Sequence, residues 1–417
     1  MAAVYKAYMA LLTRISNPVK SHSFFLFGAR GVGKTSLLRT KLPKENSSYI
    51  DLLNANDFDR FAIHPQQLSD FIAALPTKGT QWVVIDEVQK APALLDMVHL
   101  EIEAHSQAKM GIHTERPKER NLLFALTGSS ARKLKRGQAN LLAGRAFLNY
   151  LFPLTHLEVP KEYNLNSMLT WGSLPAIVTA DSDATRAEFL SSYVHTYLRE
   201  EILEEQIARS APTFRRFLEV AAQMNGEPVN NAAIGRDVGL STPTIQTYFE
   251  ILEDTLIAFR LDPFHQSVRK RQREAPKYYF FDLGVTRALA GGLRAELTPH
   301  NYGFGKAFEH FIICEIVRLS NYASNGWRFS YLRTKDNLEI DLIIDRPGKP
   351  LALVEIKSAD FIKDEHLKSL RQLGADIPES ECFCLCQEPR AKLVDGIHVL
   401  PWRDGLVELG ITLKTGD

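Results

Sequence analysis

One short segment constrains the fold of this chain more than any other: an apolar run that leads directly into a glycine-rich loop. Residues 24–26 are apolar, and residues 28–35 fit the pattern G-x-x-x-x-G-K-[ST] in full. In such a loop, glycines allow the backbone N–H groups to turn inward around phosphate oxygens, and the following helix adds the positive end of its dipole. The segment therefore predicts a strand, a phosphate-binding loop and a helix, in that order. The residues predicted to bind the phosphate-bearing ligand are Gly28, Ala29, Arg30, Gly31, Val32, Gly33, Lys34, Thr35 and Ser36.

A second segment supplies the carboxylates that nucleotide hydrolysis requires. Residues 82–85 are apolar and predict a buried strand, which runs into Asp86 and Glu87. We expect Lys34 to reach the β- and γ-phosphates, and the Thr35 hydroxyl to ligate Mg²⁺. Asp86 would hold the metal from the second shell, and Glu87 would polarise the attacking water. Acidic pairs after strands also cap helices, but both motifs in this order favour an ATP or GTP site, with ATP and Mg²⁺ as ligands, and hydrolysis.

The surrounding pattern predicts the fold class of this region. Apolar runs that read as strands alternate with helical stretches, which is typical of an α/β domain whose parallel sheet has helices on both faces. These runs are residues 24–27, 49–53, 82–85, 122–126 and 146–151. After the fourth run, Ser129 is a candidate to sense the γ-phosphate. Arg145 is a candidate arginine finger that stabilises charge on the transferring phosphoryl group, and the alternative for Arg145 is a surface salt bridge.

Further runs at residues 126–130, 142–145, 151–154, 171–175 and 275–284 carry a family resemblance. They are similar to a widespread prokaryotic family of AAA-type ATPases whose members have a C-terminal domain of unknown function. The resemblance extends from about residue 23 to about residue 402, with mild departures such as Leu283, where threonine is common. It implies an ATPase core, a small helical lid, a winged helix and a nuclease-like end, and it supplies no substrate.

Residues 211–262 predict a helix-turn-helix. Phe214, Phe217, Leu218 and Ala221 recur at helical spacing, a second helix is expected over residues 232–238, and a third from Thr242. The expected wing that follows is basic, since it carries Arg269, Lys270, Arg271, Arg273 and Lys277 against the single acid Glu274. A basic wing can neutralise phosphates of any sequence. The third helix has no lysine or arginine, which favours non-specific or shape-directed DNA binding; the alternative is a winged helix that packs against protein.

The C-terminal third carries three carboxylates and a lysine. A helix over residues 304–319 contains Glu309, and strands expected over residues 338–344 and 351–356 contain Asp341 and Glu355. Lys357 lies two residues after Glu355 and therefore on the same strand face. Such a set suits Mg²⁺-dependent phosphodiester hydrolysis, and it resembles the PD-(D/E)XK nuclease superfamily. The alternatives are an ordinary strand with exposed charges, and a nuclease fold that binds DNA without cutting it.

Three cysteines alternate along the run at residues 382–386, and their spacing favours core packing over a tetrahedral metal site. Four cysteines in all, with no signal sequence and no apolar run long enough to span a bilayer, lead us to expect a cytoplasmic protein.

Composition narrows the remaining choices. The chain has 417 residues, 45% hydrophobic and 24% charged, with a formal net charge of +1, which excludes a disordered chain and a uniformly basic nucleic-acid coat protein. We expect four parts: a P-loop ATPase domain (1–155), a helical lid and connector (156–210), a winged helix (211–290) and a nuclease-like domain (291–417). The leading hypothesis is an ATPase that acts on DNA, including branched or broken DNA. The alternative is a slow nucleotide-dependent switch in signalling or defence, and an arginine finger acting in trans would require a homo-oligomer.

Overall fold

The computed structural model describes residues 12–112, 116–130, 142, 144–197, 211–265, 275–299 and 301–411. The chain divides into two compact units, the first made of Met1–Phe152 with Asp254–Leu256 and the second of Pro153–Glu253 with Ile257–Asp417. Among the described residues, no helix has the length and apolar character that crossing a membrane requires.

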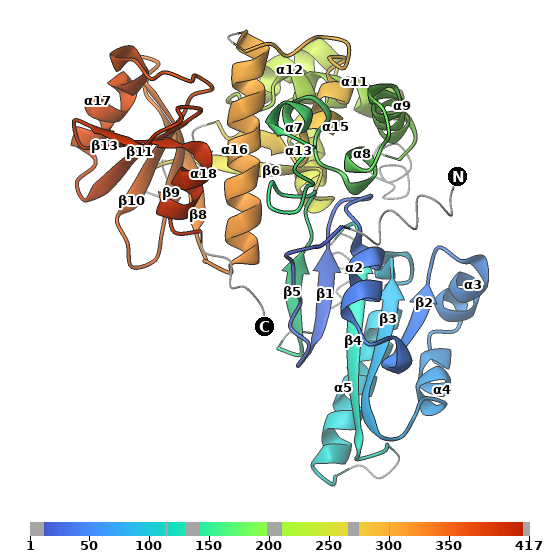
Figure 1. The fold of residues 1–417 in the computed structure, drawn as a ribbon. Coiled ribbons are helices and arrows are strands. Elements are labelled where there is room, and N and C mark those ends of the chain that lie inside the picture. Colours follow the sequence, from blue (N-terminus) through green and yellow to red (C-terminus); the bar gives the residue numbers. More distant parts are fainter. Residues whose placement is uncertain are drawn as a thin grey trace. The chain divides into compact units, whose positions relative to one another are not determined.

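The first unit is built on a five-stranded parallel sheet in the order β2-β3-β4-β1-β5, with helices on both faces (Figure 1). This confirms the predicted fold class. The strands are β1 (Ser23–Phe27), β2 (Ser47–Asp51), β3 (Gly79–Asp86), β4 (Arg120–Gly128) and β5 (Ala146–Tyr150). The helices are α2 (Lys34–Lys41), α3 (Ala55–Ile63), α4 (Gln67–Ala73) and α5 (Leu94–Lys109), with short 3₁₀ turns at Lys44–Asn46 and Val88–Lys90.

The apolar sequence of the central strands explains why they are central. All five residues of β1 are buried, and Phe25, Val83 and Phe124 from three neighbouring strands lie in one hydrophobic core. Strands buried on both faces read as continuous apolar runs, as these do. Because Phe27 is in register with Gly128, and Ile85 with Leu126, the carboxyl ends of β1, β3 and β4 meet at one edge of the sheet. The loops that follow these strands therefore come together there.

The second unit begins with a set of helices and a two-stranded hairpin. They are α7 (Leu165–Trp171), α8 (Pro175–Val178), α9 (Asp183–Ser192), a π-helical turn (Tyr193–Tyr197), α11 (Ala211–Gln223), α12 (Asn231–Val238), α13 (Thr242–Asp254) and α15 (Leu283–Leu289). The hairpin pairs β6 (Ala258–Pro263) with β7 (Lys277–Phe280). In the helix-turn-helix region, Tyr248 of α13 packs edge-on against Phe214 and Phe217 of α11, as the helical periodicity of these residues predicts.

A long helix, α16 (Tyr302–Tyr322), then leads into the C-terminal strands (Figure 1). These are β8 (Arg328–Arg333), β9 (Glu339–Asp345), β10 (Leu351–Ile356), β11 (Ser380–Cys386), β12 (Lys392–Val394) and β13 (Ile397–Pro401), with a 3₁₀ turn (Asp364–Leu367), α17 (Lys368–Asp376) and α18 (Trp402–Glu408). Cys384 and Cys386 are buried in the apolar core beside β11 and Cys382 packs against it, so core packing is the role the structure gives them.

The hairpin and the C-terminal strands form one sheet, in the order β12-β13-β11-β10-β9-β8-β6-β7. The junction is a short parallel pairing in which Asp262 and Pro263 of β6 face Ser330 and Tyr331 of β8. The predicted winged-helix and nuclease-like parts thus share a sheet, and the division of the chain into four domains stays a prediction.

Candidate functional site

The glycine-rich loop after β1 has the backbone that phosphate binding requires. Gly31 and Gly33 adopt φ angles of 85° and 96°, which side chains disfavour. A Cβ on Gly28 would lie 2.3 Å from the Leu151 carbonyl oxygen, so only glycine fits there. Helix α2 begins at Lys34 with no side-chain cap and no acidic residue in its first turn. Its N–H groups are therefore available to an anion, and they carry the positive end of the helix dipole.

Lys34 is buried inside this loop. Its side chain is 5% exposed, and its Nζ donates to the carbonyl oxygens of Gly28 at 2.8 Å and Ala29 at 3.4 Å. The Oε1 atom of Glu87 lies 3.9 Å from the same Nζ. Neutral carbonyls do not neutralise the ammonium group, and the carboxylate lies at the limit of contact. Lys34 can therefore still pair with a further anion.

Asp86 receives hydroxyl groups from two directions. Thr35 Oγ1 donates to Asp86 Oδ2 at 2.6 Å, and the Thr127 hydroxyl donates to Oδ1. The Thr127 oxygen also accepts from the Glu87 N–H at 3.2 Å. A hydroxyl and a carboxylate side by side at a loop with open N–H groups form a hard-oxygen donor set, which fits Mg²⁺ carried by a nucleotide.

Glu87 and Ser129 are joined by a residue that the motifs did not single out. Gln89 Nε2 donates to Glu87 Oε2 at 2.5 Å and to Ser129 Oγ at 3.1 Å. Glu87 itself has a φ of 59°, which turns the chain sharply after β3. The predicted residues Lys34, Thr35, Asp86, Glu87 and Ser129 thus come together at one sheet edge. Thr127 and Gln89 complete the network, and no sequence motif pointed to Gln89.

Arg145 lies elsewhere in the same unit. It precedes β5, and Ala146 is in register with Ser23, the first residue of β1. Arg145 is therefore at the amino-terminal edge of the sheet, roughly 15 Å of strand away from the loop after β1. Its guanidinium pairs with Glu103 at 2.6 Å, and this hydrogen bond lowers the pKa of that carboxyl. Within one chain Arg145 forms a surface salt bridge, so its predicted role as an arginine finger applies only to the nucleotide of a neighbouring subunit.

The second unit contains the predicted carboxylate set, which we call the carboxylate cluster: Glu309, Asp341, Glu355 and Lys357. Asp341 Oδ2 accepts from the Ile356 N–H at 2.8 Å. Lys357 Nζ lies 2.5 Å from Glu355 Oε1. The remaining oxygen of Glu355, Oε2, is buried and has no hydrogen-bond partner among the described residues.

Contacts from outside the cluster hold Glu309. The Tyr279 hydroxyl donates to Glu309 Oε1 at 2.8 Å, and Lys306 Nζ lies 3.5 Å from Glu309 Oε2. Tyr279 belongs to β7, so the hairpin contributes a side chain to the cluster. This contact follows from the shared sheet, which the sequence did not predict.

Burial dominates the electrostatics of the cluster. It raises the pKa of Asp341 to about 6, with Glu309 adding to the effect, and it raises the pKa of Glu355 to about 8, with Asp341 adding to the effect. Burial alone would lower the pKa of Lys357, but Asp341 and Glu355 raise it. Among the residues that the structure describes, no three histidine, cysteine or acidic side chains are arranged to hold a metal ion. Metal binding by Glu309, Asp341 and Glu355 therefore stays a prediction.

One residue of the predicted basic wing is not available to DNA. Lys277 is 1% exposed, and its ammonium group pairs with Glu339 of β9 and lies 4.9 Å from the ring centroid of Tyr331. The expectation that Lys277 contributes to a phosphate-binding surface is wrong, because the shared sheet buries it. The other predicted wing residues, Arg269, Lys270, Arg271, Arg273 and Glu274, lie outside the described part of the chain.

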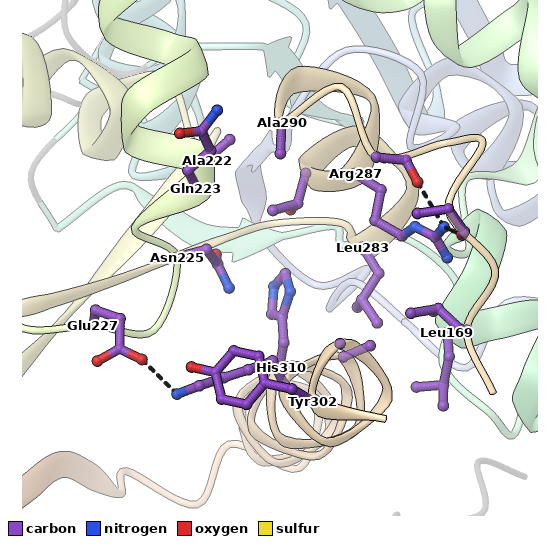
Figure 2. A pocket seen from close by; sticks show the side chains of 17 residues that line it. Leu169, Ala222, Gln223, Asn225, Glu227, Leu283, Arg287, Ala290, Tyr302 and His310 are labelled. Atoms are coloured by element: carbon purple, nitrogen blue, oxygen red, sulfur yellow. Dashed lines mark hydrogen bonds and ion pairs between the residues drawn. The ribbon is translucent and has the colours of Figure 1, made fainter. Parts of the chain in front are cut away.

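A cavity of about 310 Å³ lies beside α16 in the second unit (Figure 2). Its walls are mostly small or apolar residues of α7, α11, α15 and α16. His310 points into it from α16, and burial lowers the pKa of His310 to about 4, so its ring is neutral near pH 7. At one side Lys306 pairs with Glu227 at 2.6 Å, and the same ammonium group contacts Glu309. Lys306 thus connects the cavity to the carboxylate cluster.

Sequence comparison assigns three regions of the chain to known domain families. Residues 20–159 match an AAA domain, residues 162–296 a domain of unknown function (DUF8612), and residues 304–404 a second domain of unknown function (DUF4143). The first match agrees with the geometry of the first unit and supports ATPase-type function. The other two divide the second unit between β7 and β8 in sequence, although those strands belong to one sheet.

Similar proteins come from bacteria and archaea. The chain is 27% identical over 332 residues to the uncharacterized protein Rv2008c of Mycobacterium tuberculosis, covering 80% of this chain and 69% of the relative. It is 21% identical over 376 residues to the uncharacterized protein MJ1544 of Methanocaldococcus jannaschii, covering 84% and 78%.

Two solved structures from Aeropyrum pernix have a distant likeness. They are the ORC2 protein in its ADPNP–ADP complexes (TM-score 0.36, 12% identity, 70% of this chain and 91% of that chain) and the ORC1 protein in complex with DNA (TM-score 0.31, 12% identity, 69% and 92%). These TM-scores are too low to support an argument about this chain.

Proposed function

We propose that this chain hydrolyses ATP at the sheet edge where Lys34, Thr35, Asp86, Glu87 and Ser129 converge. The observation that carries the proposal is the coincidence of an uncapped helix N-terminus, a buried lysine and a carboxylate bonded to the Thr35 hydroxyl. A bound nucleotide with Mg²⁺ would bring the phosphoanhydride bond and the charge-neutralising cation.

The residues of the site divide the work of phosphoryl transfer. The loop N–H groups and Lys34 bind and orient the phosphates, since an ammonium group and backbone donors fix their oxygens in place. Thr35 and Asp86 supply oxygens on the metal side. Glu87 accepts a hydrogen bond from the attacking water, and this bond turns a lone pair of the water oxygen toward the phosphorus. Ser129 donates its hydroxyl to a γ-phosphate oxygen.

DNA is the partner that we propose for the second unit. The support is the helix-turn-helix layout of α11–α13, the hairpin that follows, and the basic residues at positions 269–273. Gln246 on α13 is exposed and Thr244 is half-buried, so α13 presents neutral polar groups. Such groups, without lysine or arginine, suit binding that depends on DNA shape more than on base sequence.

The experiment that tests both proposals is an ATPase assay of the full chain with single-stranded, duplex, forked and four-way DNA. We expect turnover in the absence of DNA and a rate that rises with at least one form. Equal rates with and without every form would exclude the DNA proposal and leave the ATPase. No turnover and no ATP binding would exclude the ATPase.

A slow nucleotide switch is the second candidate, and one observation favours it. The Oε1 atom of Glu87 lies 3.9 Å from the Lys34 ammonium nitrogen, so a bound phosphate must draw Lys34 away before this oxygen is free to act on water. In that case ADP would copurify with the protein, turnover would be slow, and DNA would have little effect.

Nuclease activity is a separate proposal that rests on the carboxylate cluster. Asp341→Ala and Lys357→Ala should each abolish Mg²⁺-dependent cleavage and leave ATP hydrolysis intact. If the wild-type chain cuts no DNA or RNA with Mg²⁺ present, the cluster has a structural or binding role.

A further inference from the structure

Gln89 lies between the two groups of the nucleotide site that act nearest the γ-phosphate. It is the middle residue of the 3₁₀ turn Val88–Lys90, directly after Glu87, and it is 7% exposed. Its single amide nitrogen donates to both Glu87 Oε2 and Ser129 Oγ. Because each hydrogen of the NH₂ group serves one acceptor, one side chain ties β3 to β4 at the point where the phosphate would bind.

The chemistry of the partners fixes the orientation of this amide. An ionised carboxylate can only accept hydrogen bonds, so the NH₂ group, and not the carbonyl oxygen, must face Glu87. The same nitrogen then donates to Ser129, whose oxygen is the acceptor in that bond. The Ser129 hydroxyl hydrogen therefore remains available for another acceptor, and a phosphate oxygen is the acceptor that this site would provide.

The carbonyl oxygen of Gln89 indicates that the position of this side chain does not maximise its own hydrogen bonds. Gln89 Oε1 is buried and has no hydrogen-bond partner among the described residues. A buried acceptor without a partner is unfavourable. Gly128 leaves the space that the amide occupies, since a Cβ there would lie 2.8 Å from Oε1. The structure therefore tolerates an unpartnered Oε1 atom, and this arrangement places the NH₂ group between Glu87 and Ser129.

We propose that Gln89 is a positioning residue for ATP hydrolysis, which makes Ser129 a donor toward the γ-phosphate and holds the Glu87 carboxylate in its orientation toward the attacking water. The inference rests on the proposed ATPase function. It adds that the two groups are coupled, so that a change at Ser129 on binding or loss of the γ-phosphate is passed to Glu87 through one amide.

The test compares Gln89→Ala and Gln89→Glu with the wild-type chain, measuring affinity for a fluorescent ATP analogue and the kcat and KM for ATP. Gln89→Ala should lower kcat at least 10-fold and change affinity less than 3-fold, because Lys34 and the loop still bind the phosphates. Gln89→Glu preserves the shape but places a second carboxylate beside Glu87. A carboxylate accepts hydrogen bonds where the amide donated them, so Gln89→Glu repels Glu87 and attracts the Ser129 hydroxyl, and kcat should fall at least 10-fold.

Two controls separate positioning from a structural effect. Gln67→Ala removes a glutamine of α4 whose oxygen accepts from Arg60, away from the nucleotide site, and should leave kcat unchanged. Ser129→Ala combined with Gln89→Ala should lower kcat by less than the product of the two single effects, since both act on one network.

The outcomes are distinct. A kcat within 2-fold of wild type for Gln89→Ala or for Gln89→Glu overturns the role of Gln89 and leaves the ATPase intact. Should Gln89→Ala fail to fold, the kcat and the ATP affinity of Gln89→Glu decide. A wild-type chain that neither binds nor hydrolyses ATP removes the proposed function, and the inference is overturned with it.

Discussion

The nucleotide site and the carboxylate cluster contain the same residue types, but the charged groups of the two sites have different partners. Each has a lysine, an aspartate and a glutamate near the ends of strands. In the first unit, Asp86 is bonded to two hydroxyl groups, which can rotate toward a new ligand. In the second, Asp341 is bonded to the backbone N–H of Ile356, which is fixed by the sheet.

The two lysines show the same contrast. Lys34 donates to carbonyl oxygens of its own loop, whereas Lys357 forms a direct ion pair with Glu355. Burial raises the pKa of both carboxyls in the cluster, because the loss of solvation outweighs the attraction of the Lys357 ammonium group. The first site is therefore prepared for an external anion, and the second already satisfies part of its charge internally.

The largest effect that would test this contrast is expected from Lys34→Ala. Without the ammonium group the β- and γ-phosphates lose their charged donor, and ATP affinity should fall at least 100-fold, on the order of 3 kcal/mol by the usual strength of charge-assisted hydrogen bonds. Titration calorimetry with Mg²⁺ and ATP measures this. Lys41→Ala, at the other end of the same helix, is the matched control and should bind ATP normally. A Lys34→Ala chain with unchanged affinity would show that the loop does not bind the phosphates.

Glu87→Gln should separate binding from turnover. The amide keeps the shape of the side chain but is a poor acceptor for the attacking water, so kcat should fall about 10²–10³-fold while ATP still binds. Glu119→Gln, at an exposed carboxylate that pairs with Lys78 on the surface, serves as the control. If kcat for Glu87→Gln stays within 3-fold of wild type, another group activates the water.

How far the sequence predicts this site depends on the range of the contacts involved. The loop, the two strands and the residues Lys34, Asp86, Glu87 and Ser129 follow from local patterns, because parallel strands end at a common edge. The position of Arg145 at the other edge follows from the same rule, applied to the start of its strand. Gln89 has no motif, and only the fold brings its amide between two strands.

The second unit shows where sequence patterns stop being informative. Helix and strand periodicity predict α11–α13, α16, β9 and β10 well, since each depends on neighbouring residues. The pairing of β6 with β8 joins residues far apart in the chain, and no pattern specifies it. Because the sequence does not specify this pairing, it predicts Lys277 as a charge of the wing. In the structure, Glu339 on a strand of the same sheet pairs with Lys277.

Replacing Lys357 should have its main effect on stability and not on ATP. Lys357→Ala leaves Glu355 Oε1 without its hydrogen-bond partner, beside an Oε2 atom that already has none among the described residues, and we expect the unfolding free energy of the second unit to fall by about 2 kcal/mol. Denaturant unfolding measures this, with ATP affinity of the same variant as the internal control. Unchanged stability in Lys357→Ala would contradict the view that the cluster is internally paired.

The cluster should also make stability depend on pH. Because the pKa of Glu355 is raised from 4.5 to about 8 in the folded chain, the folded state binds a proton that the unfolded state has released. The stabilisation that this proton gives the folded chain is complete below pH 4.5 and is lost as the pH rises through 8. The unfolding free energy then changes by on the order of 1 kcal/mol per pH unit at most. His310, whose pKa is lowered to about 4, has the opposite sign but acts only below about pH 6.5. Asp341, whose pKa is raised from 3.8 to about 6, acts with the same sign as Glu355 but mainly below that pH. Unfolding midpoints between pH 7 and 8 therefore report mainly on Glu355, and Glu355→Gln should flatten them; an equally steep profile in that variant would assign the dependence to another group.

The smallest effect is expected at Thr127. It tests whether the nucleotide site differs from the carboxylate cluster because hydroxyl groups that can rotate hold Asp86. The Thr127 hydroxyl donates to Asp86 and accepts from the Glu87 N–H, so Thr127→Val removes both bonds at nearly constant volume. Asp86 would keep its bond from Thr35, and we expect kcat to fall about 10-fold, which corresponds to about 1.4 kcal/mol for the loss of both bonds of the Thr127 hydroxyl. Thr127→Ser restores the hydroxyl and should recover most of the rate, whereas a purely steric role for the side chain would leave Thr127→Val active and Thr127→Ser impaired. Measuring both variants at several Mg²⁺ concentrations sharpens the result, because a displaced Asp86 carboxylate should raise the Mg²⁺ requirement of Thr127→Val and leave that of Thr127→Ser unchanged.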